Sequence, residues 1–201
     1  ISALVRDINA VDVAGATPAT LIGPFFRPDA PVLELGADIS LDGRGERLDV
    51  TGRVRSTSGK PVPRAVVEVW HANGEGLYEN QEPDRQPEFN LRGNFIADAA
   101  GRFHFHSVKP KGYELPQDGP VGQLLNAMGY ALARPAHVNF RVSAPGFHTL
   151  TTEFFDRDDP AIGNDALFNV KPQLLAEFVP CAGGRWSADF TVVLAPVKEP
   201  A

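Results

Sequence analysis

Two tyrosines and a histidine stand in segments where their side chains could bind a metal ion. Tyr78 lies in GLYEN, Tyr113 in PKGYELP and His137 in RPAHVNF. A phenol binds a metal as its anion, and because its ordinary pKa is about 10, only a strong Lewis acid such as ferric iron ionises it readily. Two tyrosinates with a histidine would therefore select Fe(III) over zinc or magnesium. The alternative is that tyrosines in such Gly- and Pro-rich loops only pack against their neighbours.

The segment RPAHVNF sets further polar side chains beside this histidine. Side chains at i and i+2 of a strand share a face, so His137 and Asn139 point the same way, with Arg134 just before them. By spacing alone this is a weak metal signal, because most histidines in a half-buried sheet only form hydrogen bonds.

A second pair of histidines occurs in the segment FHFH. His104 and His106 also share a strand face and could bind a metal together. No carboxylate nearby in the sequence offers a third ligand. The alternative is that both lie on a solvated face while Phe103 and Phe105 fill the core.

The composition indicates a folded protein with a hydrophobic core. The 201 residues are 43% hydrophobic and 22% charged, as in one ordinary domain. The net charge of −6 argues against nucleic acid or an anionic membrane as partner. The single cysteine excludes an internal disulfide and favours a cytoplasmic location. We see no signal peptide or membrane-spanning run, and because the chain starts at Ile1 we expect further sequence upstream.

The strand and turn signals predict an all-β fold. We expect a β-sandwich of short antiparallel strands, with an extended N-terminal arm and few helical turns. RLDVTGRVRSTSG alternates Leu48, Val50, Gly52 and Val54 and, with VPRAVVEVWHANGEG, predicts a hairpin or neighbouring strands. Further strand-like runs are GRFHFHSV, AHVNFRVSA, HTLTTEFF and WSADFTVVLA. VGQLLNAM predicts one or two helical turns.

The N-terminal quarter of the chain has a different pattern. Leu4, Val5 and Ile8 lie at helical spacing, so residues 1–10 could be the end of a helix. The proline-rich stretch that follows predicts an extended tether over a surface or along a pocket wall. We therefore divide the chain into an arm over 1–44 and a β-sandwich domain over 45–201.

The ordered motifs resemble those of the intradiol ring-cleavage dioxygenases, the catechol and hydroxyquinol 1,2-dioxygenase group. The resemblance runs from about Thr17 to about Phe168, through ATPATLIGPFF, VEVWHANGEGLYENQ, EFNLRG with DAAGRF, VKPKGYELPQDGPVGQLL, RPAHVNFRVSAPGF and FFDRDDP. Their order and spacing argue against coincidence. The wording PKGYELPQDGPVGQ is more similar to the hydroxyquinol branch than to the catechol branch.

The resemblance implies a non-haem Fe(III) centre held by two tyrosines and two histidines. By motif these ligands fall on Tyr78, Tyr113 and His137, while Asn139 occupies the place of the second histidine. An amide oxygen is a poorer ligand for ferric iron than imidazole, so we expect weaker iron binding. The alternative function is a degenerate, iron-poor relative that binds aromatics without turnover. A purely structural or carbohydrate-binding sandwich would not explain the motif order.

A second departure from the resemblance occurs at Glu153, in LTTE, where catechol members carry a pocket glutamine. Asn139 and Glu153 each lie seven positions from Gly146, so a symmetric hairpin through APGF would put them on one face. We predict that Glu153 gives a carboxylate oxygen to the metal, directly or through water, in place of the missing imidazole. The alternative is an ion pair with Arg134 or exposure to solvent.

The resemblance also implies a reaction in a catalytic domain over 45–201. A catechol- or hydroxyquinol-type ring binds the iron through both oxygens, and O2 opens it to a cis,cis-muconate-type diacid, or a maleylacetate-type product from hydroxyquinol. Tyr113 would take a substrate proton and Arg134 would stabilise carbanion-like charge, with Glu153 as a further candidate catalytic residue.

Three residues are candidates for the pocket wall, namely Pro24, Phe25 and Val54. The implied partners are a small aromatic diol or triol and O2. A homodimer is also expected, formed through a helical N-terminal region whose end lies within residues 1–44.

Overall fold

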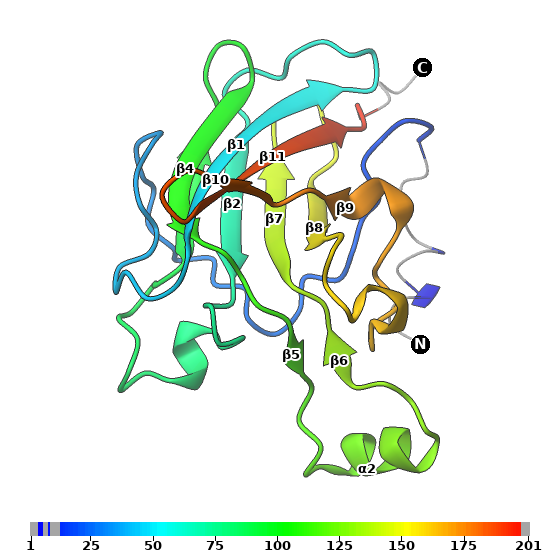
Figure 1. Ribbon diagram of the computed structural model, residues 1–201. Coiled ribbons are helices and arrows are strands. Elements are labelled where there is room, and N and C mark those ends of the chain that lie inside the picture. The colour runs from blue at the N-terminus through cyan, green and yellow to red at the C-terminus, as the bar shows by residue number, and fades with distance from the viewer. Residues whose placement is uncertain (1–3, 6–7, 9–12, 198–201) are drawn as a thin grey trace.

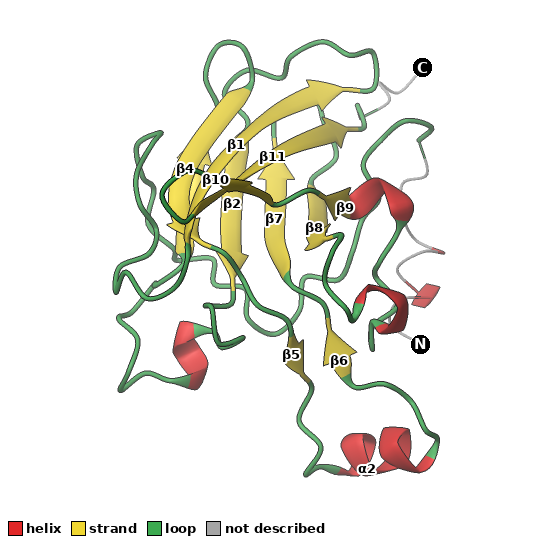
Figure 2. Cartoon of the chain, in the orientation of Figure 1, coloured by secondary structure: helices red, strands yellow, loops and turns green. Residues whose placement is uncertain are grey.

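The computed structural model describes residues 4–5, 8 and 13–197, and strands make up most of its regular structure (Figures 1 and 2). The strands are β1 (Arg47–Ser56), β2 (Val66–His71), β3 (Arg92–Ile96), β4 (Arg102–Val108), β5 (Tyr113–Glu114), β6 (Ala133–Arg134), β7 (His137–Ser143), β8 (Leu150–Asp156), β9 (Leu175–Ala176), β10 (Val179–Cys181) and β11 (Arg185–Leu194). The short helices are η1 (Glu79–Gln81), α2 (Pro120–Ala127), η2 (Ile162–Asn164) and η3 (Pro172–Leu174). The prediction of a mainly β fold is confirmed. The helix end expected over residues 1–10 lies mostly outside the described residues.

Two sheets carry the fold, and the first lies across the second in Figure 1. One has the strand order β10-β11-β1-β4, the other β3-β2-β7-β8-β9, and β5 pairs with β6 apart from both. The prediction of antiparallel strands is wrong for two pairs, since β1–β11 and β8–β9 are parallel. The predicted β1–β2 hairpin is also wrong, because these strands belong to different sheets. Alternating hydrophobic residues identify a buried face but do not identify the partner strand.

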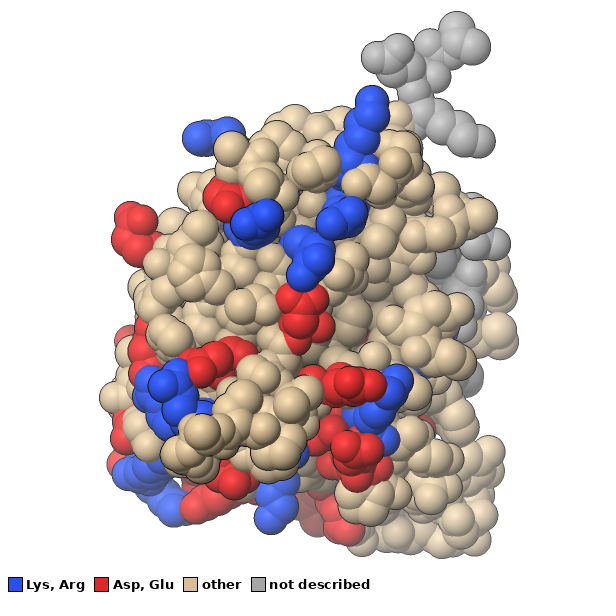
Figure 3. Space-filling model, turned by 45° about the horizontal axis from the view of Figure 1, so that its top comes forward, with Lys and Arg blue, Asp and Glu red and all other residues tan. Residues whose placement is uncertain are grey.

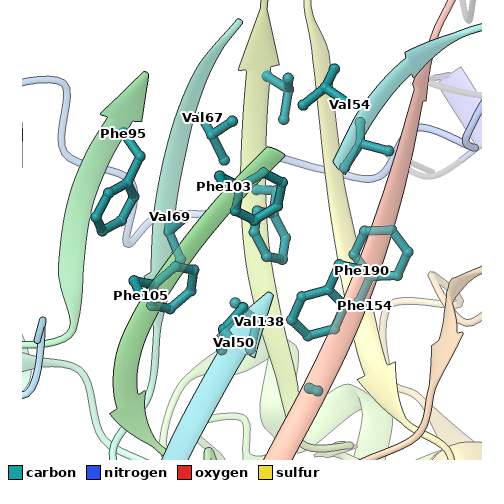
Figure 4. Packing of buried hydrophobic residues seen from close by; sticks show 14 of the residues in the cluster. Val50, Val54, Val67, Val69, Phe95, Phe103, Phe105, Val138, Phe154 and Phe190 are labelled. Carbon is teal, nitrogen blue, oxygen red and sulfur yellow. The ribbon is translucent and has the colours of Figure 1, made fainter. Parts of the chain in front are cut away.

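The hydrophobic core lies between the two sheets (Figure 4). On β1 the side chains of Leu48, Val50 and Val54 are buried, as their alternation predicts, and the residues next to them in the chain are exposed or half-buried. Aromatic rings from both sheets fill the middle, where Phe140 of β7 contacts Phe103 and Phe190. This core holds β7 and β8 in place, so the opposite face of their sheet can carry polar groups.

Two irregular segments lie outside the two sheets. Before β1 the chain runs along β3 and β4, where the amides of Leu33 and Ile39 donate to the carbonyls of Asn94 and His106. Between β5 and β6 an excursion carries α2, which projects away from both sheets in Figure 1. α2 confirms the predicted helical turns, and Pro120 occupies its first turn, where a missing N–H costs nothing.

The outer face of β4 carries the two histidines of the FHFH segment. Phe103 and Phe105 are buried in the core, whereas His104 is exposed and the His106 Nδ1 lies 2.6 Å from the Asp49 carboxylate. The solvated-face alternative is therefore confirmed.

The surface drawn in Figure 3 carries charges of both signs, and in the lower part of the view acidic and basic side chains lie side by side. Within the described residues, none of the helices has the length and apolarity needed to cross a membrane.

Candidate metal centre

A cavity of about 270 Å³ lies on the face of the five-stranded sheet that is turned away from the core. Along β7, Val138 and Phe140 point into the core, so His137 and Asn139 point to the opposite face. A second apolar cluster covers this face, with Trp70 and Tyr78 packed against Phe25. The cavity wall is mostly apolar, which keeps water away from the polar groups at its floor.

Tyr78 is held by the turn that follows β2. The Asn73 carboxamide oxygen accepts the amides of Glu75 and Leu77, which fixes this turn. The amide of Tyr78 donates to Gln81 Oε1 at 2.8 Å. The Tyr78 ring is 2% exposed and stacks on Phe25 with ring centroids 4.1 Å apart.

A buried ion pair supports Tyr78 from behind. Arg92 Nε donates to Glu79 Oε2 at 2.8 Å, and both side chains are almost fully buried. The Arg92 guanidinium also donates to the carbonyl oxygen of Phe25. It therefore ties the residue after Tyr78 to the residue whose ring stacks on Tyr78.

Tyr113 and Arg134 face each other across the short β5–β6 ladder, in which they are direct partners. Burial raises the pKa of the Tyr113 phenol, and the charge and hydrogen bond of Arg134 oppose that rise. The ladder thus places a phenol and a fixed positive charge side by side, although 21 positions separate them in the sequence.

His137 begins β7, and its Nε2 lies close to the oxygen of Tyr78, a residue that lines the cavity. Its Nδ1 lies 2.7 Å from the carbonyl oxygen of Pro135, and since a carbonyl only accepts, Nδ1 carries the proton. Burial, followed by the charge of Arg134, lowers the His137 pKa, so the ring is neutral. The lone pair of Nε2 therefore faces the site.

The side chains of the two tyrosines and the histidine lie close together. The Tyr78 oxygen lies 3.5 Å from His137 Nε2, and the rings of Tyr78 and Tyr113 meet edge to face with centroids 6.0 Å apart. Burial, followed by the neighbouring Tyr113, raises the Tyr78 pKa well above its ordinary value, whereas the Asn139 hydrogen bond lowers it. Without a cation these phenols stay protonated at neutral pH.

Asn139 turns the NH2 group of its side-chain amide, and not the amide oxygen, toward Tyr78. Its Nδ2 donates to the Trp70 carbonyl at 2.9 Å and to the Tyr78 oxygen at 3.0 Å. Because the Trp70 carbonyl only accepts, the amide cannot be flipped without losing this bond. The assignment of Asn139 as a metal ligand stays a prediction, and in this geometry its side chain turns its N–H groups toward Tyr78.

Arg134 and Glu153 form a buried ion pair at the edge of the cavity. The Arg134 Nη1 and Nη2 donate to Glu153 Oε1 and Oε2 at 3.0 and 3.2 Å, and Nε donates to Asp165 at 3.0 Å. Asn169 Nδ2 donates to Glu153 Oε2 at 2.8 Å. The two carboxylates raise the pKa of Arg134 although burial opposes its charge. The predicted alternative, an Arg134–Glu153 pair, is therefore present.

The hairpin register that placed Glu153 beside the site is confirmed. Asn139 and Glu153 are direct partners in the β7–β8 ladder. Pro24 and Phe25 line the cavity as predicted. The prediction for Val54 is wrong, because its side chain is fully buried between the sheets, where β1 pairs it with Val192. Its position in an alternating strand already indicated the core face.

Several residues at the cavity were not predicted from the sequence. Trp70 and Gln81 line it, and Asp165 and Asn169 hold the charged pair. Trp70 lies in the same sequence motif as Tyr78, so its place beside the site could have been predicted from the sequence. Asp165 and Asn169 lie in a loop with no pattern of its own, so only the fold reveals their partners.

The side chains at the cavity floor fit a trivalent ion such as Fe(III). Among the residues that the structure describes, no three His, Cys, Asp or Glu side chains gather as a metal site, so tyrosines must supply part of the ligand set. Tyr78, Tyr113 and His137 supply two hard oxygen donors and one nitrogen with a free lone pair. This donor set suits ferric iron better than zinc.

Comparison with known proteins places this arrangement in a class. A family model described as Dioxygenase matches residues 22–195. Hydroxyquinol 1,2-dioxygenase of Rhizobium sp. (strain MTP-10005) is 48% identical over 207 residues, covering 97% of this chain and 70% of that protein. Catechol 1,2-dioxygenase of Candida albicans is 39% identical, covering 85% of this chain and 57% of that protein. Crystalline hydroxyquinol 1,2-dioxygenase from Pseudomonas putida DLL-E4 has a TM-score of 0.91 at 36% identity, covering 98% of this chain and 72% of that one.

The fold and the matched relatives define a dioxygenase. More narrowly, the chain belongs to the intradiol ring-cleavage dioxygenases, the enzyme family that includes the hydroxyquinol and catechol 1,2-dioxygenases. It spans between 57% and 72% of the lengths of the three proteins just described.

Proposed function

We propose that this chain is an Fe(III)-dependent dioxygenase that opens a hydroxyquinol- or catechol-type ring with O2 to a diacid. The observation that carries the proposal is that Tyr78 and Tyr113 line a small apolar cavity and that His137 Nε2 lies 3.5 Å from the Tyr78 oxygen. Hydroxyquinol is the preferred substrate of the proposal, because a hydroxyquinol 1,2-dioxygenase is 48% identical to this chain.

The residues of the cavity divide the work between binding and proton transfer. Bound Fe(III) would supply a Lewis acid for the two ring oxygens. The apolar wall, with Pro24 and Phe25, holds the ring and excludes water from it. Tyr113 is the group that takes a proton from a substrate hydroxyl, since Arg134 beside it stabilises the phenolate and so eases release and return of the proton.

Arg134 is the candidate for stabilising negative charge that develops on the ring. Its guanidinium is 4% exposed and is fixed by Glu153 and Asp165, so it needs no reorganisation during the reaction. These two carboxylates also offset part of its field, so we propose a positioning role for Arg134 as well as an electrostatic one.

The division of the chain and its assembly belong to the same proposal. An arm over 1–44 supplies Pro24 and Phe25 to the cavity of a catalytic domain over 45–201, so the two parts act together. The homodimer and the cytoplasmic location stay predictions. Light scattering on the purified chain tests the first of these.

The experiment that tests the function measures O2 uptake by protein loaded with Fe(III). We expect hydroxyquinol to be consumed with one O2 per ring, and mass spectrometry to find a product heavier than the substrate by one O2. Tyr78→Phe should abolish turnover, whereas Tyr130→Phe should not, because Tyr130 lies outside the cavity and is 45% exposed. Iron-loaded protein that binds the ring without consuming O2 would favour the degenerate alternative.

A further inference from the structure

A short gap separates two electron-pair donors beside the proposed iron centre. His137 Nε2 and Glu153 Oε1 lie 3.8 Å apart, and their side chains are 2% and 3% exposed. The His137 proton is on Nδ1, where the Pro135 carbonyl accepts it, so no proton lies between Nε2 and the carboxylate. Two facing lone pairs in a dry site need a cation between them to be favourable.

The Glu153 carboxylate is free to share one of its oxygens. Oε2 accepts hydrogen bonds from Arg134 and Asn169. Oε1 accepts from Arg134 Nη1 and is also the oxygen nearest to Nε2. A carboxylate oxygen has two lone pairs, so one can remain in the ion pair while the other binds a metal.

The distances are within the reach of one ion. The Tyr78 oxygen lies 3.5 Å and Glu153 Oε1 3.8 Å from His137 Nε2. Two donors that bind one ion at about 2.1 Å can lie up to about 4.2 Å apart. The Tyr78 oxygen and Glu153 Oε1 are therefore each close enough to His137 Nε2 to share an ion with it.

The buried charges also favour a trivalent ion. With both phenols ionised, the site would hold two phenolates, the carboxylates of Glu153 and Asp165, and the Arg134 guanidinium. Their formal sum is −3, since four negative groups face one positive group. A trivalent cation cancels this charge, whereas a divalent one would leave a buried negative charge.

We propose that Glu153 is a ligand of the iron centre and that Asn139, directly opposite it, is a hydrogen-bond donor that positions the Tyr78 oxygen. The proposal rests on the proposed function for the presence of iron. It gives the site two phenolates, one imidazole and one carboxylate, and it assigns to Asn139 the N–H contact of 3.0 Å to Tyr78.

The test compares Glu153→Gln with Asp165→Asn. Both variants remove one negative charge from Arg134, but only Glu153 faces His137. After Fe(III) loading, metal content and competition with citrate give the iron affinity. We expect a loss of at least about 100-fold for Glu153→Gln, beyond the range of about 10–100-fold typical for groups that only support a ligand, and a loss below about tenfold for Asp165→Asn.

Two further variants and a spectrum keep the proposal falsifiable. The tyrosinate-to-iron charge-transfer band should move to longer wavelength in Glu153→Gln, because loss of an anionic ligand makes the iron more electron-poor. Asn139→His combined with Glu153→Gln should restore iron binding, and Asn139→Leu should keep the iron while shifting the band. Equal affinity and an unchanged band in Glu153→Gln would overturn the proposal, as would loss of iron in Asn139→Leu alone.

The outcomes for this proposal and for the function can be told apart. Wild-type protein that binds Fe(III) through Glu153 but cleaves no ring would refute the function and leave the ligand assignment standing. Ring cleavage by the wild type, together with unchanged iron affinity in Glu153→Gln, would refute the ligand assignment and leave the proposed function standing. Wild-type protein that binds no Fe(III) would refute both.

Discussion

Arg134 pairs with two buried carboxylates at the cavity, those of Glu153 and Asp165. Arg134→Met would leave both carboxylates without this partner in a site closed to water. We expect a loss of about 3–5 kcal/mol in the free energy of unfolding, the range found when one partner of a buried pair is removed. Urea denaturation of the metal-free protein measures it.

The control for this prediction is Arg157→Met. Arg157 pairs with Glu177, whose side chain is 65% exposed, so water can solvate the carboxylate that remains. We expect a loss of about 1 kcal/mol or less for this variant. Equal losses in the two variants would mean that burial does not decide the strength of the Arg134 network.

His71 makes the stability of the fold depend on pH. It is 1% exposed, its Nδ1 lies 2.7 Å from the Ala72 carbonyl, and its Nε2 lies 2.7 Å from Ser107 Oγ. Burial lowers its pKa to about 4, so the unfolded chain binds a proton below about pH 6.5 that the folded chain does not. Stability should therefore fall by about 3 kcal/mol as the pH falls from 7 to 4.

The measurement is urea denaturation across this pH range for wild type and His71→Gln. Gln can keep one of the two hydrogen bonds and does not titrate. The variant should be less stable at pH 7 and should lose less stability on acidification. A pH profile of the same slope in both proteins would assign the acid sensitivity to other groups.

The residues that hold the site differ in how far the sequence predicts them. Tyr78, Tyr113, His137 and Arg134 lie in short motifs whose residue types already indicate their chemistry. Asp165 contacts Arg134 although 31 positions separate them, and no local sequence pattern predicts that contact. Asn139 shows a further limit, because the residue type alone does not say whether the amide presents its oxygen or its N–H groups.

At the scale of the strands, local pairing was predictable and distant pairing was not. The β7–β8 hairpin follows from its turn at Gly146, and its register follows from the hairpin's symmetry, which gave the Asn139–Glu153 partnership. β1 instead pairs with β11, more than 130 positions away, and in parallel orientation. The strands beside β1, which are β11 and β4, show the same alternation of hydrophobic residues as other strands. The alternation therefore cannot identify them as the partners of β1, and the fold as a whole determines the pairing.

The β1–β4 ladder offers a test of packing at Gly52. Gly52 is the direct partner of Phe103, and a Cβ atom at Gly52 would lie 2.2 Å from the end of the Phe103 ring. Gly52→Ala should cost about 1–3 kcal/mol, because the ring must move against its neighbours in a close-packed core. Thermal and urea denaturation measure the loss.

A matched glycine and a second-site change control this prediction. Gly163→Ala adds the same methyl group where nothing lies within 4 Å, so its effect should stay within about 0.5 kcal/mol. Phe103→Leu should partly rescue Gly52→Ala, and the double variant should be more stable than the sum of the single losses predicts. Additive losses would show that the two positions do not compete for space.

At the scale of the whole molecule, the proposed ion joins segments that the sheets hold only in part. Tyr78 lies in the turn after β2, Tyr113 in the short β5–β6 ladder and His137 at the start of β7. The core lies on the other face of the five-stranded sheet and does not depend on these donors. The metal-free chain should therefore fold, and the loops around the cavity should gain most from the ion.

Loading the protein with Ga(III), a trivalent ion that does not cycle its redox state, tests this division. At a free concentration of about 100 times Kd the ion should add about 2.7 kcal/mol to the free energy of unfolding, because it binds the folded chain alone. Hydrogen exchange should slow at residues 76–82 and 112–116, and should change little in β1, β4 and β11, which lie across the core from the site. Zn(II) should do less, because it leaves the phenols protonated or the site negatively charged. Uniform protection of all strands, or an equal effect of Zn(II), would contradict a trivalent centre that orders the cavity while the sheets stay as they are.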